Sequence, residues 1–465
     1  MRLQEILGLV RDNFYLALFA VSAIAVLFAL LYLIGRKTFL KGWSPLSLGR
    51  LFVLAAFTGY LIMVAGVTLF NRGPGYQAGV DLSLFSTYRE AWHLFSVRHW
   101  QFIYLNILML VPFGALLPLL HPRFRKAAWT IGLAALLTLS IETIQLITGY
   151  GNFVADDLFN NLLGAIIGYG LTMGFIRLKE KGVKRALIFF SPLLTVVVLS
   201  AGLFGYYEMK ELGNLSIVPA HRADLKQAAV SADVDMNKTG GTAPVYSAPV
   251  LTKKTADEFA RDFFKRLGKN PAEIEDLSYP EEGLYRVQGE PAYQLSVRFR
   301  DGNFSLTDFS QLDDGMEPMD TDEETVRESL SQFGVEIPRD AEFRQTGPGT
   351  YEWAVNQQER GDRMTDGTLA AVYYNDGTVK ELDNRLITYR KVKEVGLKSE
   401  HSAYQELLKG KFLTLPGNQK IGTLQVHDVK LTYSLDSKGY YQPVYAFRCT
   451  LDGEDTTLLI PAMAQ

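Results

Sequence analysis

The sequence contains one cysteine, Cys449, and only six histidines among 465 residues. A single cysteine cannot form an internal disulfide and cannot build a cysteine-based zinc site. The chain also contains no G-x-S-x-G, P-loop or H-E-x-x-H motif, and it has no dense basic stripe outside short connections. We therefore predict no metal, no cofactor and no nucleic-acid partner.

Charge is unevenly divided along the chain, although its formal total is only −3. Residues 1–215 carry 18 Lys and Arg against 10 Asp and Glu, whereas residues 216–465 carry 29 against 40. Because 48% of all residues are hydrophobic, a wholly disordered chain is excluded. The mean hydropathy near zero averages an apolar half with a polar one, so we predict two units in different surroundings.

The first half contains six apolar stretches, each of roughly 20 residues, which is the length that an α-helix needs to cross a bilayer. They lie near residues 13–34, 51–70, 101–120, 128–148, 158–176 and 186–206. These stretches predict a polytopic bundle of six transmembrane helices within residues 1–206. The first stretch is expected to be an anchor, with a cleaved signal peptide as the alternative.

Basic residues alternate between the connections. Residues 35–50, 121–127 and 177–185 hold twelve Lys and Arg, whereas the opposite connections hold only Arg72, Arg89 and Arg98. Because basic loops face the cytoplasm, both termini and residues 207–465 are predicted to be extracytoplasmic on the cell membrane.

The second half begins with a polar stretch, residues 207–254, that contains many Ala, Ser, Thr, Gly and Pro. We expect it to be a flexible linker. Residues 255–465 then repeat a helical pattern followed by alternating hairpins, with Thr255 as the expected first N-cap and turns at Asp301-Gly302 and Asp376-Gly377. The tail is therefore predicted to be an α+β domain of helix-and-hairpin units, as one body or as two subdomains.

Glu142 is the one formal charge inside the six apolar stretches. A lone carboxylate in hydrocarbon is costly unless it has a partner or a wet cavity. Gln145 falls on the same helical face, and Thr138 lies one turn earlier, so the fourth span presents a polar stripe to the bundle. An ion pair with Arg72 would be a structural explanation for Glu142.

Other polar residues are expected at a similar depth, near the outer leaflet. Asn106 comes early in the third span, and Asp157 and Asn161 open the fifth. The glycine pair Gly164-x-x-x-Gly168 would let a neighbouring helix approach closely. The acidic pair at 156–157 also begins a helix, so capping is an alternative to a binding role.

Five blocks of residues appear in a fixed order between about 60 and 170: VTLFNR, DLSLFSTY, N-x5-PFG from Asn106, S-x-E-x-x-Q from Ser140, and DDLFNNLLGAIIGY. This stretch resembles the VanZ-like family of membrane proteins, with a core of about 60–176. Many members have an arginine shortly before the acidic pair, where this chain has Gly151-Asn152-Phe153. By this resemblance, the polar positions of the family correspond to Arg72, Asn106, Glu142, Gln145, Asp157 and Asn161, which are the expected site residues.

The resemblance implies a role in the Gram-positive cell envelope and in resistance to teicoplanin-type glycopeptide antibiotics. We expect an outer-leaflet pocket that binds membrane lipids, a lipid-linked wall precursor or a lipophilic glycopeptide. The tail looks faintly like the extracytoplasmic domains of YycH/YycI-type regulators, through KGYYQPVYAF at 438–447, and is expected to contact an envelope partner protein.

Two alternatives stay open. An intramembrane enzyme would use Glu142 and Asp157 as general acid and base, with Arg72 holding a phosphate. A flippase would need polar groups along a path to the cytoplasmic side, and the fifth and sixth spans are apolar beyond Asn161. Binding is favoured over catalysis.

Overall fold

The structure is a computed structural model that describes residues 47–70, 79–413 and 420–464. The chain divides into two compact units. The membrane unit holds the residues up to Ala91 and Arg98–Lys210, and the second unit holds Trp92–Val97 together with the chain from Glu211 onward, which we call the tail. Each unit is described separately below.

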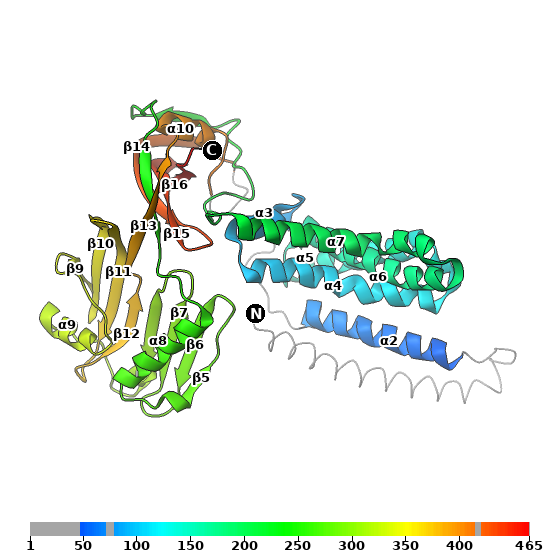
Figure 1. Ribbon diagram of the computed structural model, residues 1–465, viewed down its shortest axis with the longest axis horizontal. Helices are drawn as coiled ribbons and strands as arrows, with labels where there is room; N and C mark the ends of the chain where they lie inside the picture. Colours follow the sequence, from blue (N-terminus) through cyan, green and yellow to red (C-terminus); the bar gives the residue numbers. More distant parts are fainter. Residues whose placement is uncertain (1–46, 71–78, 414–419, 465) are drawn as a thin grey trace. The chain divides into compact units, whose positions relative to one another are not determined.

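Five of the six predicted spans are confirmed as helices long and apolar enough to cross a membrane, and the first lies outside the described residues. These helices are α2 (Leu48–Ala65, extended by the π-helix η1, Gly66–Phe70), α4 (Val97–Leu120), α5 (Ala127–Thr148), α6 (Ala155–Lys181) and α7 (Val183–Met209). The shorter elements are β1 (Val80–Asp81), α3 (Ser86–Leu94), η2 (Pro122–Arg125) and β2 (Phe153–Val154). Figure 1 shows α4 to α7 running side by side.

Helix α6 is central to this bundle: 56% of its most apolar segment is buried, against none in α7. Glycines allow the close packing of α6 on α4. A Cβ at Gly164 would lie 1.8 Å from the carbonyl oxygen of Ile107, and one at Gly168 would lie 1.9 Å from that of Val111. The expected close approach at the G-x-x-x-G pair is therefore present, and α4 is the neighbour.

The tail is mostly sheet. Its described strands form one fourteen-stranded sheet whose main path runs β3-β14-β15-β4-β13-β11-β12-β8-β7-β6-β5, with β9 joined through β10 to β11, and β16 to β15. The strands are β3 (Ala229–Ala232), β4 (Thr242–Ser247), β5 (Ile274–Asp276), β6 (Glu282–Val287), β7 (Tyr293–Arg298), β8 (Phe304–Asp308), β9 (Glu342–Gly347), β10 (Thr350–Arg360), β11 (Arg363–Tyr373), β12 (Val379–Asn384), β13 (Ile387–Gly396), β14 (Thr423–Leu435), β15 (Tyr440–Leu451) and β16 (Glu454–Pro461). The helices are α8 (Lys253–Arg266), η3 (Pro271–Glu273), η4 (Phe309–Leu312), α9 (Glu323–Ser331) and α10 (Glu400–Leu408).

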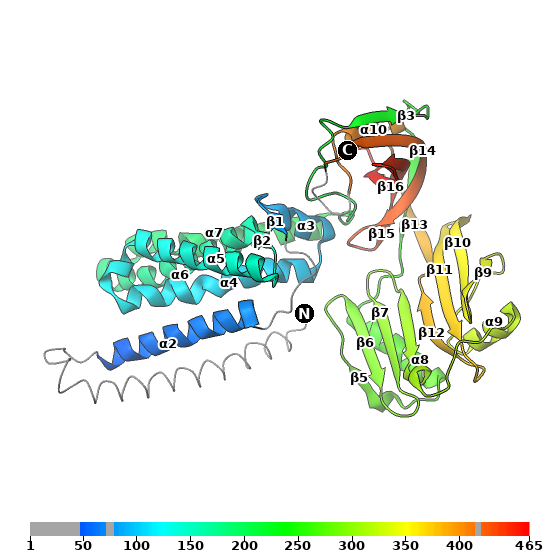
Figure 2. The same ribbon diagram turned by 180° about the vertical axis from the view of Figure 1, so that it is seen from behind.

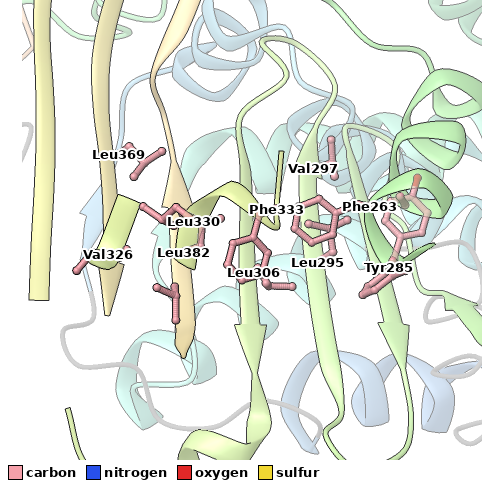
Figure 3. Packing of buried hydrophobic residues seen from close by; sticks show 14 of the residues in the cluster. Phe263, Tyr285, Leu295, Val297, Leu306, Val326, Leu330, Phe333, Leu369 and Leu382 are labelled. Atoms are coloured by element: carbon pink, nitrogen blue, oxygen red, sulfur yellow. The ribbon is translucent and has the colours of Figure 1, made fainter. Parts of the chain in front are cut away.

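The two largest hydrophobic clusters in the described part of the tail pack helices on this sheet. In the larger one, α8 and α9 pack on β6 to β8 and β10 to β12, and Figure 3 shows its side chains in a row from Leu369 and Val326 at one side to Phe263 and Tyr285 at the other. In the other core, α10 packs on β14 to β16 around Leu407 and Phe447. The apolar face of each helix thus covers one stretch of sheet, which is the helix-and-hairpin arrangement expected from the sequence.

The structure corrects the prediction that residues 207–254 are a flexible linker. Helix α7 continues to Met209, and β3 and β4 belong to the sheet, where β4 lies between β15 and β13. Val245 and Tyr246 are 0% and 3% exposed. Composition alone does not reveal these strands, because partner strands that are distant in sequence supply their hydrogen bonds and bury their apolar side chains.

The predicted turns at Asp301-Gly302 and Asp376-Gly377 join β7 to β8 and β11 to β12, which pair antiparallel. The first tail helix begins earlier than expected. Its N-cap is Thr252, whose hydroxyl accepts from the Thr255 N–H, and Thr255 in turn accepts from the Thr252 N–H. Thr255 is therefore the N3 residue of a capping box rather than the N-cap.

Candidate functional site

The polar stripe predicted on α5 is buried in the bundle. Thr138, Glu142 and Gln145 are 2%, 3% and 4% exposed. The Gln145 amide donates to the Thr68 carbonyl oxygen at 2.9 Å, which ties α5 to η1. Thr68 lies in the last turn of η1, where carbonyl oxygens have no intrahelical partner.

Glu142 contacts the segment that leads into α6. Its Oε2 accepts a hydrogen bond from the Val154 N–H at 3.3 Å, just before α6 begins at Ala155. Glu142 also interacts with other residues. The carboxylate is thus placed at the α5–α6 connection, at the same end of both helices.

The polar residues of α6 reach two other helices. The Asn106 amide of α4 donates to Asp157 Oδ1 at 2.5 Å, and the Asn161 amide donates to Thr138 Oγ1 of α5 at 2.9 Å. Asp157 and Asn161 lie one helical turn apart, so both contacts occur on the first two turns of α6. The structure therefore gathers Asn106, Glu142, Gln145, Asp157 and Asn161 at one end of the bundle. Arg72 lies outside the described residues.

Asp156 was not singled out as a site residue, and it has the most hydrogen bonds of this region. It is fully buried and accepts from the N–H groups of Phe85 and Thr87 at 2.5 and 2.8 Å. The hydroxyls of Thr87 and Ser86 donate to it at 2.6 and 3.3 Å. The carboxylate therefore caps the N-terminus of α3. The capping interpretation expected it to cap α6, in whose first turn it lies, but α6 has no side-chain cap hydrogen bond.

A sequence signal for this contact exists. The residue before α3 is Phe85, whose side chain has no hydrogen-bond acceptor that could cap the helix. A helix that begins after such a residue needs an acceptor from elsewhere, and the acidic pair supplies it.

Asn160 was also missed. Its side-chain oxygen accepts from the Tyr88 hydroxyl of α3. Among the described residues, Asn160 Nδ2 and Asn161 Oδ1 are buried side-chain atoms without a hydrogen-bond partner. Buried amide atoms normally have partners, so these two keep hydrogen-bonding capacity for another molecule, water included.

The described residues contain no group of three or more His, Cys, Asp or Glu that could hold a metal ion. In the tail, burial raises the pKa of the Cys449 thiol to about 12, and the side chain is fully buried in a strand, so it is not a nucleophile. Asp322 is the N-cap of α9, and Glu323 and Glu324 lie in its first turn, so these acidic residues stabilise the start of the helix.

The tail has a cavity of about 730 Å³ between the turns that end β6, β8 and β11. The Lys380 side chain, 4% exposed, lies in its wall and forms ion pairs with Asp376 at 2.6 Å and with Asp308 at 3.7 Å. Burial opposes ionisation of Asp376, but hydrogen bonds from Lys380 and Thr378 lower the pKa of that carboxyl below its ordinary value. The buried ammonium is therefore held between two carboxylates.

Residues 57–177 match the model of the VanZ/LLP1 family, so this segment is VanZ-like and the resemblance found in the sequence is confirmed. The similarity of the tail to YycH/YycI-type domains is not confirmed. No curated protein matches the chain. One similar solved structure is an uncharacterized protein from Eubacterium rectale, with 11% identity and a TM-score of 0.26, covering 50% of this chain and 86% of that one.

Proposed function

We propose that this VanZ-like membrane protein binds a lipid-linked wall precursor or a lipophilic glycopeptide at the polar end of its bundle. Binding there contributes to resistance to teicoplanin-type antibiotics, the context with which the family is associated. The observation that carries the proposal is the convergence of five polar residues from α4, α5 and α6 at one end of the helices, with Glu142, Gln145 and Asn161 fully buried.

Energetics support a ligand role for part of this set. Burying polar groups in a membrane bundle is costly unless each finds a partner. The free amide atoms of Asn160 and Asn161 are left without one among the described residues. Sugar hydroxyls, amides and phosphates of a wall precursor or glycopeptide are donors and acceptors of the required kind, and the attached lipid would stay in the bilayer.

The polar groups favour binding over passage across the membrane. In the described spans, the buried polar side chains lie toward the end where α6 begins, except for Thr138 in the middle of α5 and Thr130 near its start. A flippase would need a path of such groups to the opposite end, where the basic connections 121–127 and 177–185 lie. By the positive-inside rule those connections are cytoplasmic, so the proposed site faces the outer leaflet.

The tail is proposed to contact an envelope partner or wall material. Its cavity has the volume of a ligand site and combines the polar Lys380 wall with the apolar side chains of Phe309, Met316 and Phe333. In this proposal the tail extends the reach of the membrane site and does not itself catalyse a reaction.

The test is teicoplanin susceptibility of a Gram-positive host that expresses wild type, Glu142→Gln, Asn161→Leu or no protein. Membrane abundance is measured for each. Glu142→Gln keeps the shape but removes the charge, and Asn161→Leu removes the free amide oxygen. Both should lose protection at unchanged abundance.

Ser140→Ala is the matched control, because Ser140 lies on the exposed face of the same helix and bonds only the Leu136 carbonyl among the contacts described. It should protect like wild type. If wild type gives no protection, the resistance role is wrong. Mass spectrometry of the lipid-linked precursors separates the alternatives, because an intramembrane enzyme using Glu142 and Asp157 would change their mass and a binding protein would not.

A further inference from the structure

The chain between β1 and α3, residues 80–85, exposes apolar side chains in an alternating pattern. The outward-facing residues are Val80, Leu82, Leu84 and Phe85, which are 50%, 69%, 54% and 47% exposed. Asp81 and Ser83, between them, are half-buried. We call residues 80–85 the wedge. A soluble loop would place its polar residues outward, so this pattern is inverted for a surface in water.

The inward side of the wedge is fixed by hydrogen bonds. Asp81 accepts from the Ser83 N–H at 2.9 Å and from the Ser86 hydroxyl at 2.8 Å. The fully buried Asp156 then accepts from the Phe85 N–H. The apolar side chains are therefore held outward by bonds on the opposite face, and they cannot turn inward without breaking them.

The wedge lies at the level where a membrane span begins. Strand β1 pairs in parallel with β2, with Val80 opposite Phe153 and Asp81 opposite Val154, and α6 starts at the next residue. Figure 2 shows β1, β2 and α3 at one end of the helices of this unit. For a helix that spans the bilayer, we expect this level to lie near the boundary between headgroups and acyl chains of one leaflet.

The apolar surface of the wedge continues onto the bundle. The Phe85 ring packs edge-on against Phe159 of α6, with centroids 5.4 Å apart, and Phe159 is itself 38% exposed. Exposed apolar side chains of a spanning helix contact lipid. The wedge thus extends a lipid-facing surface sideways from the end of α6.

We propose that the wedge inserts into the acyl-chain boundary of the leaflet at the N-terminal end of α6, and that its partner is the phospholipid bilayer. Leu82 and Leu84 enter the hydrocarbon, whereas Asp81 and Ser83 stay on the protein side. The inserted loop anchors α3 beside the buried polar residues of α6. This inference is independent of the ligand proposed above.

The experiment measures the surroundings of single nitroxide labels on the full-length protein in phosphatidylglycerol–phosphatidylcholine vesicles. Labels are placed at Leu82 and Leu84 in a Cys449→Ser background. Power-saturation electron paramagnetic resonance then compares collisions with oxygen, which concentrates in hydrocarbon, and with nickel(II) ethylenediaminediacetate, which stays in water. The reference positions are two exposed leucines, Leu136 in the middle of α5 and Leu312 in the tail, 61% and 76% exposed.

Labels at Leu82 and Leu84 should collide with oxygen several-fold more than with the nickel complex. They should resemble the label at Leu136 but lie at a shallower depth, and the label at Leu312 should show the opposite preference. Nickel accessibility equal to that of Leu312 would show the wedge in water and overturn the proposal. Low accessibility to both reagents would show that protein covers the wedge, which also overturns it.

Discussion

Removal of the Asp156 carboxylate should release α3 from the membrane bundle. In Asp156→Ala, the N–H groups of Phe85 and Thr87 and the Thr87 hydroxyl lose the acceptor that they share. Ser86 keeps a bond to Asp81 at 2.8 Å. Three part-buried hydrogen bonds at about 1 kcal/mol each give a loss of about 3 kcal/mol. This value also includes the lost helix cap, which alone is worth about 1 kcal/mol.

The assay is hydrogen exchange of full-length protein in nanodiscs, followed on peptides that cover residues 85–94. A loss of about 3 kcal/mol corresponds to roughly a 100-fold faster exchange of amides that open together with α3. Asp156→Asn keeps one acceptor oxygen and should cause a smaller increase. Ser140→Ala, whose side chain is exposed on α5, should leave these peptides unchanged.

Unchanged protection of α3 in Asp156→Ala would refute this reasoning. It would mean that the four hydrogen bonds contribute no net stability, because water or a neighbouring group replaces the carboxylate at no cost. Faster exchange throughout the whole membrane unit would instead show that α3 and the bundle open together as one cooperative unit.

Three further predictions concern the packing of each unit. Gly164→Ala places a methyl group against the α4 backbone and should lower membrane abundance and the melting temperature. Gly202→Ala, which lies in open space on α7, is the control and should change neither quantity. Size-exclusion profiles of a fluorescent fusion compare the two variants. Lys380→Met leaves Asp308 and Asp376 without their ammonium partner and should lower the free energy of unfolding of the tail by about 3 kcal/mol. The measurement is amide hydrogen exchange, which should become faster in β12. Unchanged exchange would show that the ion pairs do not stabilise the tail. Cys449 should resist maleimide at pH 8 until the tail unfolds, and rapid labelling of folded protein would contradict its burial.

The membrane half of the fold is readable from the sequence because hydrocarbon imposes a simple rule. A span must be about 20 apolar residues long, and the stretches near 101–120 and 128–148 correspond closely to α4 and α5. In the tail, local sequence patterns predict the secondary structure less completely. Its helices and the hairpins with Asp-Gly turns were predicted, since these signals lie within a few residues. Strand β4 was not, because its partners β13 and β15 lie more than 130 residues away in the chain.

The candidate site shows the same division. Glu142 stands out as the one charge within an apolar stretch, and Asn106, Asp157 and Asn161 stand out by their position near the same end of a span. Their pairing is a matter of helix rotation and tilt, which the pattern does not give: Asn106 contacts Asp157, and Asn161 contacts Thr138. Contacts made by the loop before α3 were missed because they join side chains about 70 residues apart.

The two neighbouring carboxylates at the start of α6 should have separable roles. Successive residues of an α-helix point about 100° apart, so Asp156 faces the N-terminus of α3 while Asp157 faces Asn106 of α4. In Asp157→Asn the partner amide can still form one hydrogen bond, so we expect full membrane abundance with loss of teicoplanin protection. In Asp156→Ala we expect abundance and protection to fall together, because α3 and the wedge are released. Quantitative blotting beside susceptibility measures both quantities. Equal loss of abundance in the two variants would place Asp157 among the structural residues and remove it from the proposed site.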